Sequence, residues 1–132
     1  MTIQIRAVTV KQLPERLSVR QGRRFLREMV RCMNVDRPRI VLDCSNVRQM
    51  NRPFIHVLLC CLEEAMKRNG DVKLAAIPPG AGAILVLSGA DRLFDIFDTA
   101  AEAESSFHQV PGDAAPRTFI TERAHQRSES AA

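Results

Sequence analysis

Apolar residues recur along the chain with two periods, every second residue near the start and every third or fourth residue in longer segments further on. Near the start they alternate with polar residues over two short segments, which is the pattern of half-buried β-strands. The apolar positions are Ile3, Ile5, Val8, Val10 and Leu13. Pro14 and Glu15 break the alternation, so the predicted strands lie before them.

A helix and a buried strand follow. Ser18 is a suitable N-cap for a helix to about Asn34, in which apolar residues recur at spacings of three and four. The sequence Asp36-Arg37-Pro38 predicts a turn, because the residue before a proline avoids the helical conformation. Residues 39–44 then predict a strand, and the apolar run Ile40-Val41-Leu42 indicates that both of its faces are buried.

A second helix is predicted from Arg52 to Asn69, with Gly70 as its C-cap. Its first turns are apolar almost all round, so we expect this end to be deeply buried. The elements predicted after it are a strand at 72–77, a helix at about 81–88 ended by Gly89, a strand at 93–97 and a helix capped by Thr99. Strands that alternate with helices indicate an α/β domain with a parallel part to its sheet.

The length of 132 residues is that of one domain. Residues 1–110 carry the periodic segments, whereas residues 111–132 are polar and small, and we expect a disordered tail there. No apolar run approaches the roughly 18 residues that a membrane span needs, and no secretory segment opens the chain. These features favour a reduced cytoplasmic protein without membrane insertion.

The net charge of +4 is unevenly distributed. Residues 1–60 hold 12 Lys/Arg against 4 Asp/Glu, a net +8, and residues 61–132 hold 7 against 11, a net −4. Arg20, Arg24, Arg27 and Arg31 share one helix face, which is either a solvated surface or a phosphate-binding stripe. With only 5% aromatic residues and no Trp or Tyr, base stacking has little support, so no nucleic-acid partner is expected.

Residues that carry chemistry are sparse. Cys32, Cys44, Cys60 and Cys61 show no metal-ligand spacing, and no Gly-rich phosphate loop is present in the sequence. Asp43 has no second carboxylate for acid–base work, and a histidine early in a buried helix, as His56 is, is more often a packing residue than a base. We therefore expect no catalytic residue, no metal site, no cofactor and no enzymatic activity.

The strand-to-helix junction from Asp43 to Phe54 is the first candidate for a functional surface, because α/β folds bind ligands where a strand ends and a helix begins. Asn51 can cap the helix, and Pro53 suits its first turn. Arg52 places a positive charge at the helix N-terminus, which is mildly unfavourable for the helix. It is either a contact for an acidic partner or a solvated side chain, and the sequence leaves both open.

Four segments of the chain together resemble a known family over roughly residues 3–107. The central one reads RIVLDCSNVRQM, with Asp43, Ser45 and Val47 in the pattern D-x-S-x-V, and the last reads SGADRLFDIFDTAAEAESSF, with the pattern G-x-D-R-L-F before an acidic helix. The other two are VTVKQLPERLSVRQGRRFLREM and NRPFIHVLLCCLEEAMKRNGDVKLAAI. The chain resembles a STAS domain, the fold of bacterial anti-sigma factor antagonists. The resemblance implies a small α/β domain with a mixed four- to five-stranded sheet packed against about four helices.

In that family the helix after the central strand begins with an Asp-Ser-Ser-Gly-like motif, whose serine is phosphorylated by a partner that is both anti-sigma factor and kinase. Aligned without a gap, the motif falls on Asn51-Arg52-Pro53-Phe54, so Pro53 replaces the phosphoacceptor and no hydroxyl remains. Phosphorylation at this point is chemically impossible. The partner-binding residues implied by the resemblance are Asp43, Ser45, Asn51, Arg52, Pro53 and Phe54.

Three functions are compatible with these features. The first is a regulatory protein-binding module that resembles an anti-sigma factor antagonist and binds an anti-sigma factor/serine kinase or related regulator, with homodimer formation left open. The alternative is a STAS subunit of a transporter, or a small-molecule or lipid-sensing module that uses an apolar groove beside Phe54 and Ile55. Nucleic-acid binding through the stripe from Arg20 to Arg31 is the weakest of the three.

Overall fold

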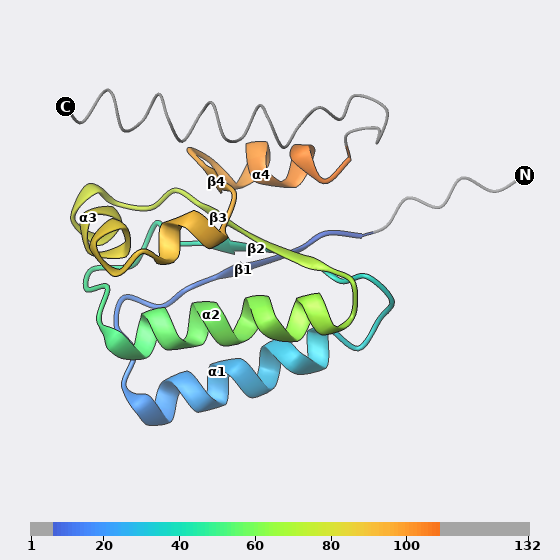
Figure 1. Cartoon of the computed structure of the whole chain (residues 1–132), viewed down its shortest axis with the longest axis horizontal. Helices are drawn as coiled ribbons and strands as arrows, with labels where there is room; N and C mark the ends of the chain where they lie inside the picture. Colours follow the sequence, from blue (N-terminus) through green and yellow to red (C-terminus); the bar gives the residue numbers. More distant parts are fainter. Residues whose placement is uncertain (1–6, 109–132) are drawn as a thin grey trace, which may run out of the picture.

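The computed structural model describes residues 7–108. In this part of the chain strands and helices alternate, and Figure 1 shows α1 and α2 on one face of the sheet, α4 on the other, and α3 at the end of the sheet. The elements are β1 (Thr9–Gln12), α1 (Val19–Cys32), β2 (Arg39–Asp43), α2 (Arg52–Lys67), β3 (Asp71–Ala75), α3 (Pro79–Ser88), a 3-10 helix (Ala90–Leu93), β4 (Ile96–Phe97) and α4 (Ala100–Ser106). The predicted apolar alternation at Ile3 and Ile5 and the predicted tail at 111–132 lie outside the described residues.

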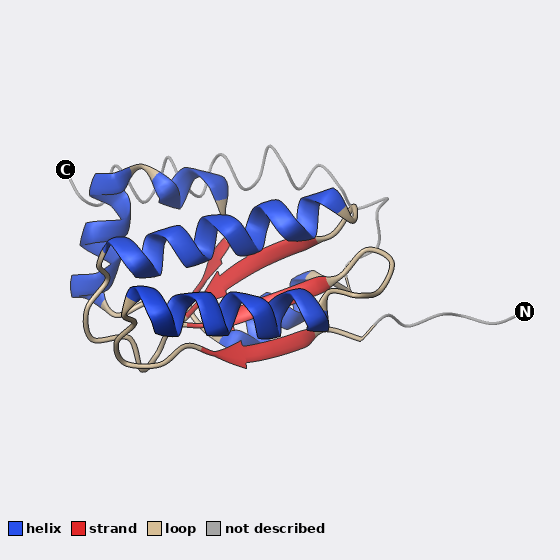
Figure 2. Cartoon of the chain, turned by 90° about the horizontal axis from the view of Figure 1, so that it is seen from below, coloured by secondary structure: helices blue, strands red, loops and turns tan. Residues whose placement is uncertain are grey.

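The four strands form one sheet in the order β1-β2-β3-β4, and every described pair is parallel. The expected α/β architecture with four helices is confirmed. The expected mixed sheet is not seen in residues 7–108, because each of the three connections between successive strands contains a helix and returns the chain to the same edge. All four strands therefore end on one side of the domain, where the loops into α2 and α3 also lie (Figures 1 and 2).

Burial of β2 on both faces is confirmed. Ile40 and Leu42 belong to the main core beneath α1 and α2, whereas Val41 belongs to a smaller cluster with Ala75 and Ala103 beneath α4. All five side chains are fully buried. Because alternate residues of a strand point to opposite faces, a strand with helices on both sides needs an uninterrupted apolar run.

The ends of α1 and α2 follow local capping rules, with one correction. The Ser18 Oγ accepts a hydrogen bond from the Gln21 N–H at 3.1 Å and the Gln21 side chain accepts one from the Ser18 N–H at 2.9 Å, a capping box that confirms the predicted helix start. At the end of α2, Asn69 and not Gly70 takes the left-handed conformation, with φ 60°. Gly70 is required instead by close approach, since a Cβ there would lie 2.2 Å from the Pro38 carbonyl oxygen.

Two predicted boundaries near the end of the domain also change. The helix expected at 81–88 begins at Pro79, which suits a first helical turn, and ends as predicted at Gly89 with φ 81°. The strand expected at 93–97 is only Ile96–Phe97, because Leu93 still belongs to the 3-10 helix and its side chain is exposed. The apolar run therefore covers two short elements.

The helix α4 is held on the sheet by two cations that surround Phe107. The Lys73 Nζ lies 4.3 Å from the centre of the Phe107 ring and donates to the Ser106 Oγ at 2.5 Å. The Arg39 Nη1 donates to the Phe107 carbonyl oxygen at 2.7 Å. Lys73 is buried, and these contacts, with a 4.0 Å approach to Asp95, keep its charge compensated.

Candidate functional site

The turn after β2 fixes the first two candidate residues. The Asp43 carboxylate accepts a hydrogen bond from the Ser45 N–H at 2.9 Å, and the Ser45 Oγ accepts one from the Gln12 side chain at 3.4 Å. Asp43 is half-buried and Ser45 is exposed. Asp43 is thus used to shape the turn, as aspartates commonly are, while the Ser45 hydroxyl stays accessible from solvent.

The loop between β2 and α2 is held in place by buried side chains and by contacts with Glu15. Cys44, Val47 and Met50 are buried in the main core. The Arg48 N–H donates to the Glu15 carbonyl oxygen at 3.0 Å, and the two side chains form an exposed ion pair at 2.5 Å. Such exposed pairs contribute little stability, so the buried apolar residues hold the loop in place.

Asn51 begins α2 and also ties it to α1. Its Oδ1 accepts a hydrogen bond from the Phe54 N–H at 3.2 Å, which confirms the predicted N-cap. Its Nδ2 donates to the Leu17 carbonyl oxygen at 3.4 Å, immediately before the cap of α1. The starts of the two helices are therefore linked by one side chain, and both polar ends of that side chain are occupied.

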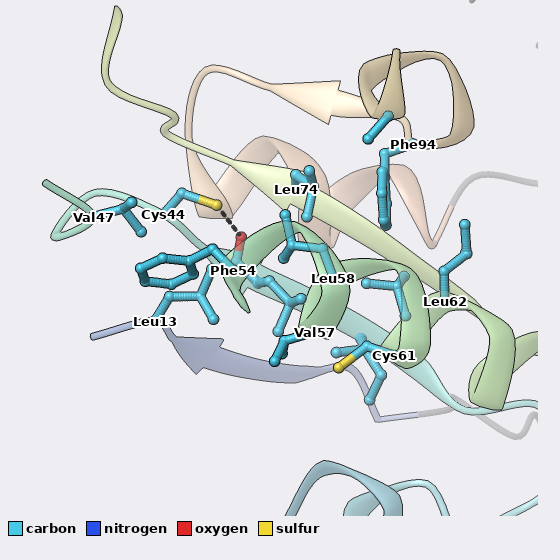
Figure 3. Packing of buried hydrophobic residues seen from close by; sticks show 14 of the residues in the cluster. Leu13, Cys44, Val47, Phe54, Val57, Leu58, Cys61, Leu62, Leu74 and Phe94 are labelled. Carbon is cyan, nitrogen blue, oxygen red and sulfur yellow. Dashed lines mark hydrogen bonds between the residues drawn. The ribbon is translucent and has the colours of Figure 1, made fainter. Parts of the chain in front are cut away.

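The next three residues point in different directions. Arg52 is exposed, Pro53 is half-buried, and Phe54 is completely buried. Figure 3 shows the Phe54 ring inside the core beside Leu13. The expected contact of Phe54 with a partner is thus not available on the surface, because its position is in phase with the other buried residues of α2. Arg52 and Pro53 are the accessible residues.

An apolar hollow lies close to the junction, but on another side than expected. It has a volume of about 320 Å³ and lies between the first turns of α1 and α2. Its lining includes Pro53 and His56 but neither Phe54 nor Ile55, beside which a groove was expected. Phe54 is buried and does not line this hollow, which lies between α1 and α2.

His56 is exposed rather than packed in the core, which corrects the expectation for the start of α2. Its Nε2 lies 3.5 Å from the Cys60 Sγ. The pKa of the Cys60 thiol is raised by partial burial and by Glu63 and Glu64, so the thiolate that a nucleophile needs is disfavoured. Within residues 7–108 no group of three or more His, Cys, Asp or Glu residues could hold a metal ion. No helix in the same range is long and apolar enough to cross a membrane.

The face of α3 is a feature that the sequence analysis missed. Its exposed large apolar residues are Ile84, Val86 and Leu87, and Leu93 follows in the 3-10 helix. Leu87 is 82% exposed, although α3 contains no charged residue. The sequence of α3 already indicated this exposure. A helix without charged residues and with apolar residues all round cannot bury every side when it covers only the end of a sheet. This face lies at the same end of the sheet as the start of α2 (Figure 1).

A family model described as STAS domain matches residues 3–103. This chain belongs to the STAS domain family. The match confirms the family suggested by the sequence motifs and covers every described strand. No curated protein sequence matches the chain.

Solved structures of other STAS domains share the fold. The first is an anti-sigma-factor antagonist (STAS) domain protein from Planctomyces limnophilus, with TM-score 0.69, 20% identity, and coverage of 77% of this chain and 92% of that one. A putative anti-sigma factor antagonist from Thermotoga maritima gives TM-score 0.67, 19% identity, and coverage of 77% and 88%. The STAS domain of a SulP transporter from Vibrio cholerae gives TM-score 0.63, 18% identity, and coverage of 79% and 83%. At these identities the likeness establishes the fold alone.

Proposed function

We propose that this STAS domain is a non-enzymatic protein-binding module of the anti-sigma-factor-antagonist type. Its docking surface is the turn with Asp43 and Ser45 together with the start of α2 at Asn51, Arg52 and Pro53, while Phe54 supports that surface from the core. The observation that carries the proposal is the exposed Arg52 in the first turn of α2, where no ion pair to another described residue neutralises it. A charge in an unfavourable place for its helix fits a role in contact with a partner.

The apolar face of α3 extends this surface. The helix α3, which carries Ile84 and Leu87, lies at the same end of the domain as the start of α2, so a partner there would meet a basic and an apolar patch together. Interfaces of this kind combine an apolar centre with charged contacts around it. The partner we propose is an anti-sigma factor/serine kinase or a related regulator in the cytoplasm.

The module would bind without the phosphorylation switch of the family, because Pro53 offers no hydroxyl at the aligned position. Incubation with a serine-kinase anti-sigma factor and ATP should leave peptide 51–54 unmodified and the affinity unchanged. Ser88 and Thr99 are used in the fold, through the Leu85 carbonyl oxygen and the cap of α4. Ser45 is an exposed serine within the junction, and phosphate found there with loss of binding would contradict an unswitched module.

Affinity capture from native extract tests the docking surface. Arg52→Ala should lose the captured partner, whereas Arg37→Ala, which removes another exposed arginine just before the start of β2, should retain it. The captured protein is identified by mass spectrometry and its binding is then measured with purified components. A partner that binds both variants equally would exclude Arg52 as part of the surface.

A second candidate is a transporter-associated STAS subunit, favoured by the likeness to the SulP transporter domain. This reading predicts that the captured partner is an integral membrane protein. A small-molecule or lipid sensor would instead show a higher melting temperature in the presence of its nucleotide or lipid, because a ligand that binds only the native state stabilises it. No shift with either class would leave protein binding as the function.

A further inference from the structure

The apolar hollow between α1 and α2 has a defined chemistry. Its apolar lining residues are Val19, Gly22, Leu26, Pro53 and Val57, and Arg23, Arg52 and His56 complete the lining. Gly22 lets the helices approach closely, since a Cβ there would lie 2.9 Å from the Val57 Cγ2. No carboxylate lines the hollow. It therefore combines apolar lining residues with two arginines.

The two arginines are available for a partner. Arg23 and Arg52 are both exposed, and neither forms an ion pair with another residue in the range 7–108. Arg20 and Arg27 lie on the adjoining exposed face of α1, so positive charge continues along the helix beyond the hollow. Glu28 is the single acidic residue of α1. An occupant with negative charge on both sides of its apolar contact would therefore be favoured.

We infer that this hollow is the anchor site for an acidic amphipathic helix of a partner protein, and the inference rests on the proposed protein-binding function. An apolar side chain of the partner enters the hollow, and carboxylates on either side of it pair with Arg23 and Arg52. Helix-in-groove recognition uses such anchors, and fully covered apolar pockets dominate the binding energy.

A protein segment fits the hollow better than other anions. Val19 is 59% exposed, so one wall stays in water unless the occupant extends across it, which a single aliphatic chain does not do. Nucleic acid could pair with the arginines, but its bases would find no Phe, Tyr or Trp side chain to stack on among the residues that line the hollow. A second copy of the chain offers the acidic α4, but Ala103 on its apolar face is fully buried against its own sheet.

The test uses a synthetic helical peptide with Leu at helical spacings i, i+3, i+4 and i+7 and Glu on the flanking positions. One twin replaces every Leu by Ala and keeps the charge, and the other replaces every Glu by Lys and keeps the apolar face. The parent should bind at least about tenfold more tightly than either twin, about 1.4 kcal/mol. In amide NMR spectra of the whole chain, the largest shifts should fall in residues 19–26 and 52–57. Equal binding of the Ala twin, or shifts elsewhere, would overturn the inference.

Two pairs of variants separate local contacts from net charge. Arg23→Gln with Arg52→Gln should weaken peptide binding about tenfold, whereas Arg24→Gln with Arg31→Gln, which removes the same charge from exposed positions outside the hollow, should change it far less. Val19→Glu should abolish anchoring, and Val35→Glu, at a residue 61% exposed in the turn after α1, should not. Both valines are exposed, so these substitutions leave the core intact.

The native partner distinguishes this inference from the proposed function. A partner lost by Arg52→Ala but retained by Val19→Glu would support the docking junction and refute the hollow as anchor. Loss of the partner with both variants would support the docking junction and the hollow, and retention of the partner by both would refute the two sites together. Decanoate and a single-stranded RNA serve as competing probes, and shifts of the same amides by either one, with none from the peptide, would refute the partner class proposed here.

Discussion

Arg52 occupies a position where its charge opposes the helix that it begins. The first turns of α1 and α2 contain no acidic residue, so nothing in either helix offsets the positive end of the helix dipole. Arg52→Glu should therefore raise the free energy of unfolding by about 0.5 kcal/mol, because an anion in the first turn is favourable. Urea denaturation followed by circular dichroism measures the change.

The matched control is Arg31→Glu in the last turn of α1, where a cation is favourable and its reversal should destabilise the protein by a similar amount. Equal effects of the two substitutions would show that only net charge matters. If Arg52→Glu is more stable yet loses the partner, then stability at this position has been sacrificed for binding.

The buried thiols Cys44 and Cys61 predict a loss of stability in alkali. Burial raises the pKa of each from 9.0 to about 12. The unfolded thiols ionise above pH 9 while the folded ones stay protonated, so stability is complete below that pH and falls as the pH rises toward 12. Each thiol should contribute a slope of about 1.4 kcal/mol per pH unit. Unfolding measured between pH 8 and about 11 should show a shallower slope in Cys44→Ala/Cys61→Ala, and an unchanged slope would contradict the burial effect.

Residue roles that depend on local geometry could be predicted from sequence, and those that depend on packing could not. The caps formed by Ser18 and Asn51 were predicted because a cap needs only its own helix turn. Phe54 was named as a partner-binding residue from its aligned motif position, although its spacing to Leu58, Cys61 and Leu62 places it on the buried face. Helical periodicity was the more reliable guide here.

Two glycines in helices have opposite expected responses to substitution. A Cβ at Gly22 would lie 2.9 Å from the buried Val57 side chain, so Gly22→Ala must push α1 from α2. Overpacking of this kind outweighs the gain in helix propensity, and we expect a net loss of about 1 kcal/mol. A Cβ at Gly82 in α3 would lie at an ordinary 3.5 Å from Ile77, so Gly82→Ala should gain about 0.5 kcal/mol. Chemical denaturation measures the free energy of unfolding of both variants. A Gly22→Ala variant more stable than the parent would show that the helices can separate without cost.

The types of the elements could be predicted because hydrophobic periodicity is strong in α1, α2 and the central strands. The residues at which the elements end were harder to predict. The stop of α2 was assigned to Gly70 because glycine favours a left-handed cap, but Asn69 fills that role. What requires Gly70 is the nearby Pro38 carbonyl, a contact between residues distant in the sequence. The exposure of α3 escaped prediction for the same reason, since it depends on how little of the helix the sheet end can cover.

At the scale of the whole molecule, the uneven charge of the sequence gives the domain one basic face and one acidic face. The arginines of α1 are exposed on one side of the sheet, and Glu102 and Glu104 of α4 are exposed on the other (Figure 1). The first half of the chain supplies the basic side because α1 and α2 both precede β3. An acidic partner is therefore steered to the side that carries the hollow and Arg52, and its association rate should fall as salt is added.

The boundary of the domain is the last feature that can be tested directly. The family match ends at residue 103 and α4 at Ser106, so a chain of residues 1–110 should keep the fold. Residues 111–132 carry three arginines against three acidic residues, so their removal leaves the net charge unchanged. We expect the melting temperature to fall by less than about 4 °C, which corresponds to less than about 1 kcal/mol.

A shorter chain that ends at Asp98 provides the contrast. It removes α4 and with it the fully buried Ala103 and the ring of Phe107 over Lys73, which would leave a lysine charge facing exposed apolar surface. The loss should amount to several kcal/mol, because the apolar cluster around Val41 and Ala75 would lose the helix that covers it. Calorimetry of the three chains separates the outcomes. A large loss already on shortening to residue 110 would move the domain boundary into the last 22 residues, and an unaffected chain ending at Asp98 would show that α4 is not part of the folded unit.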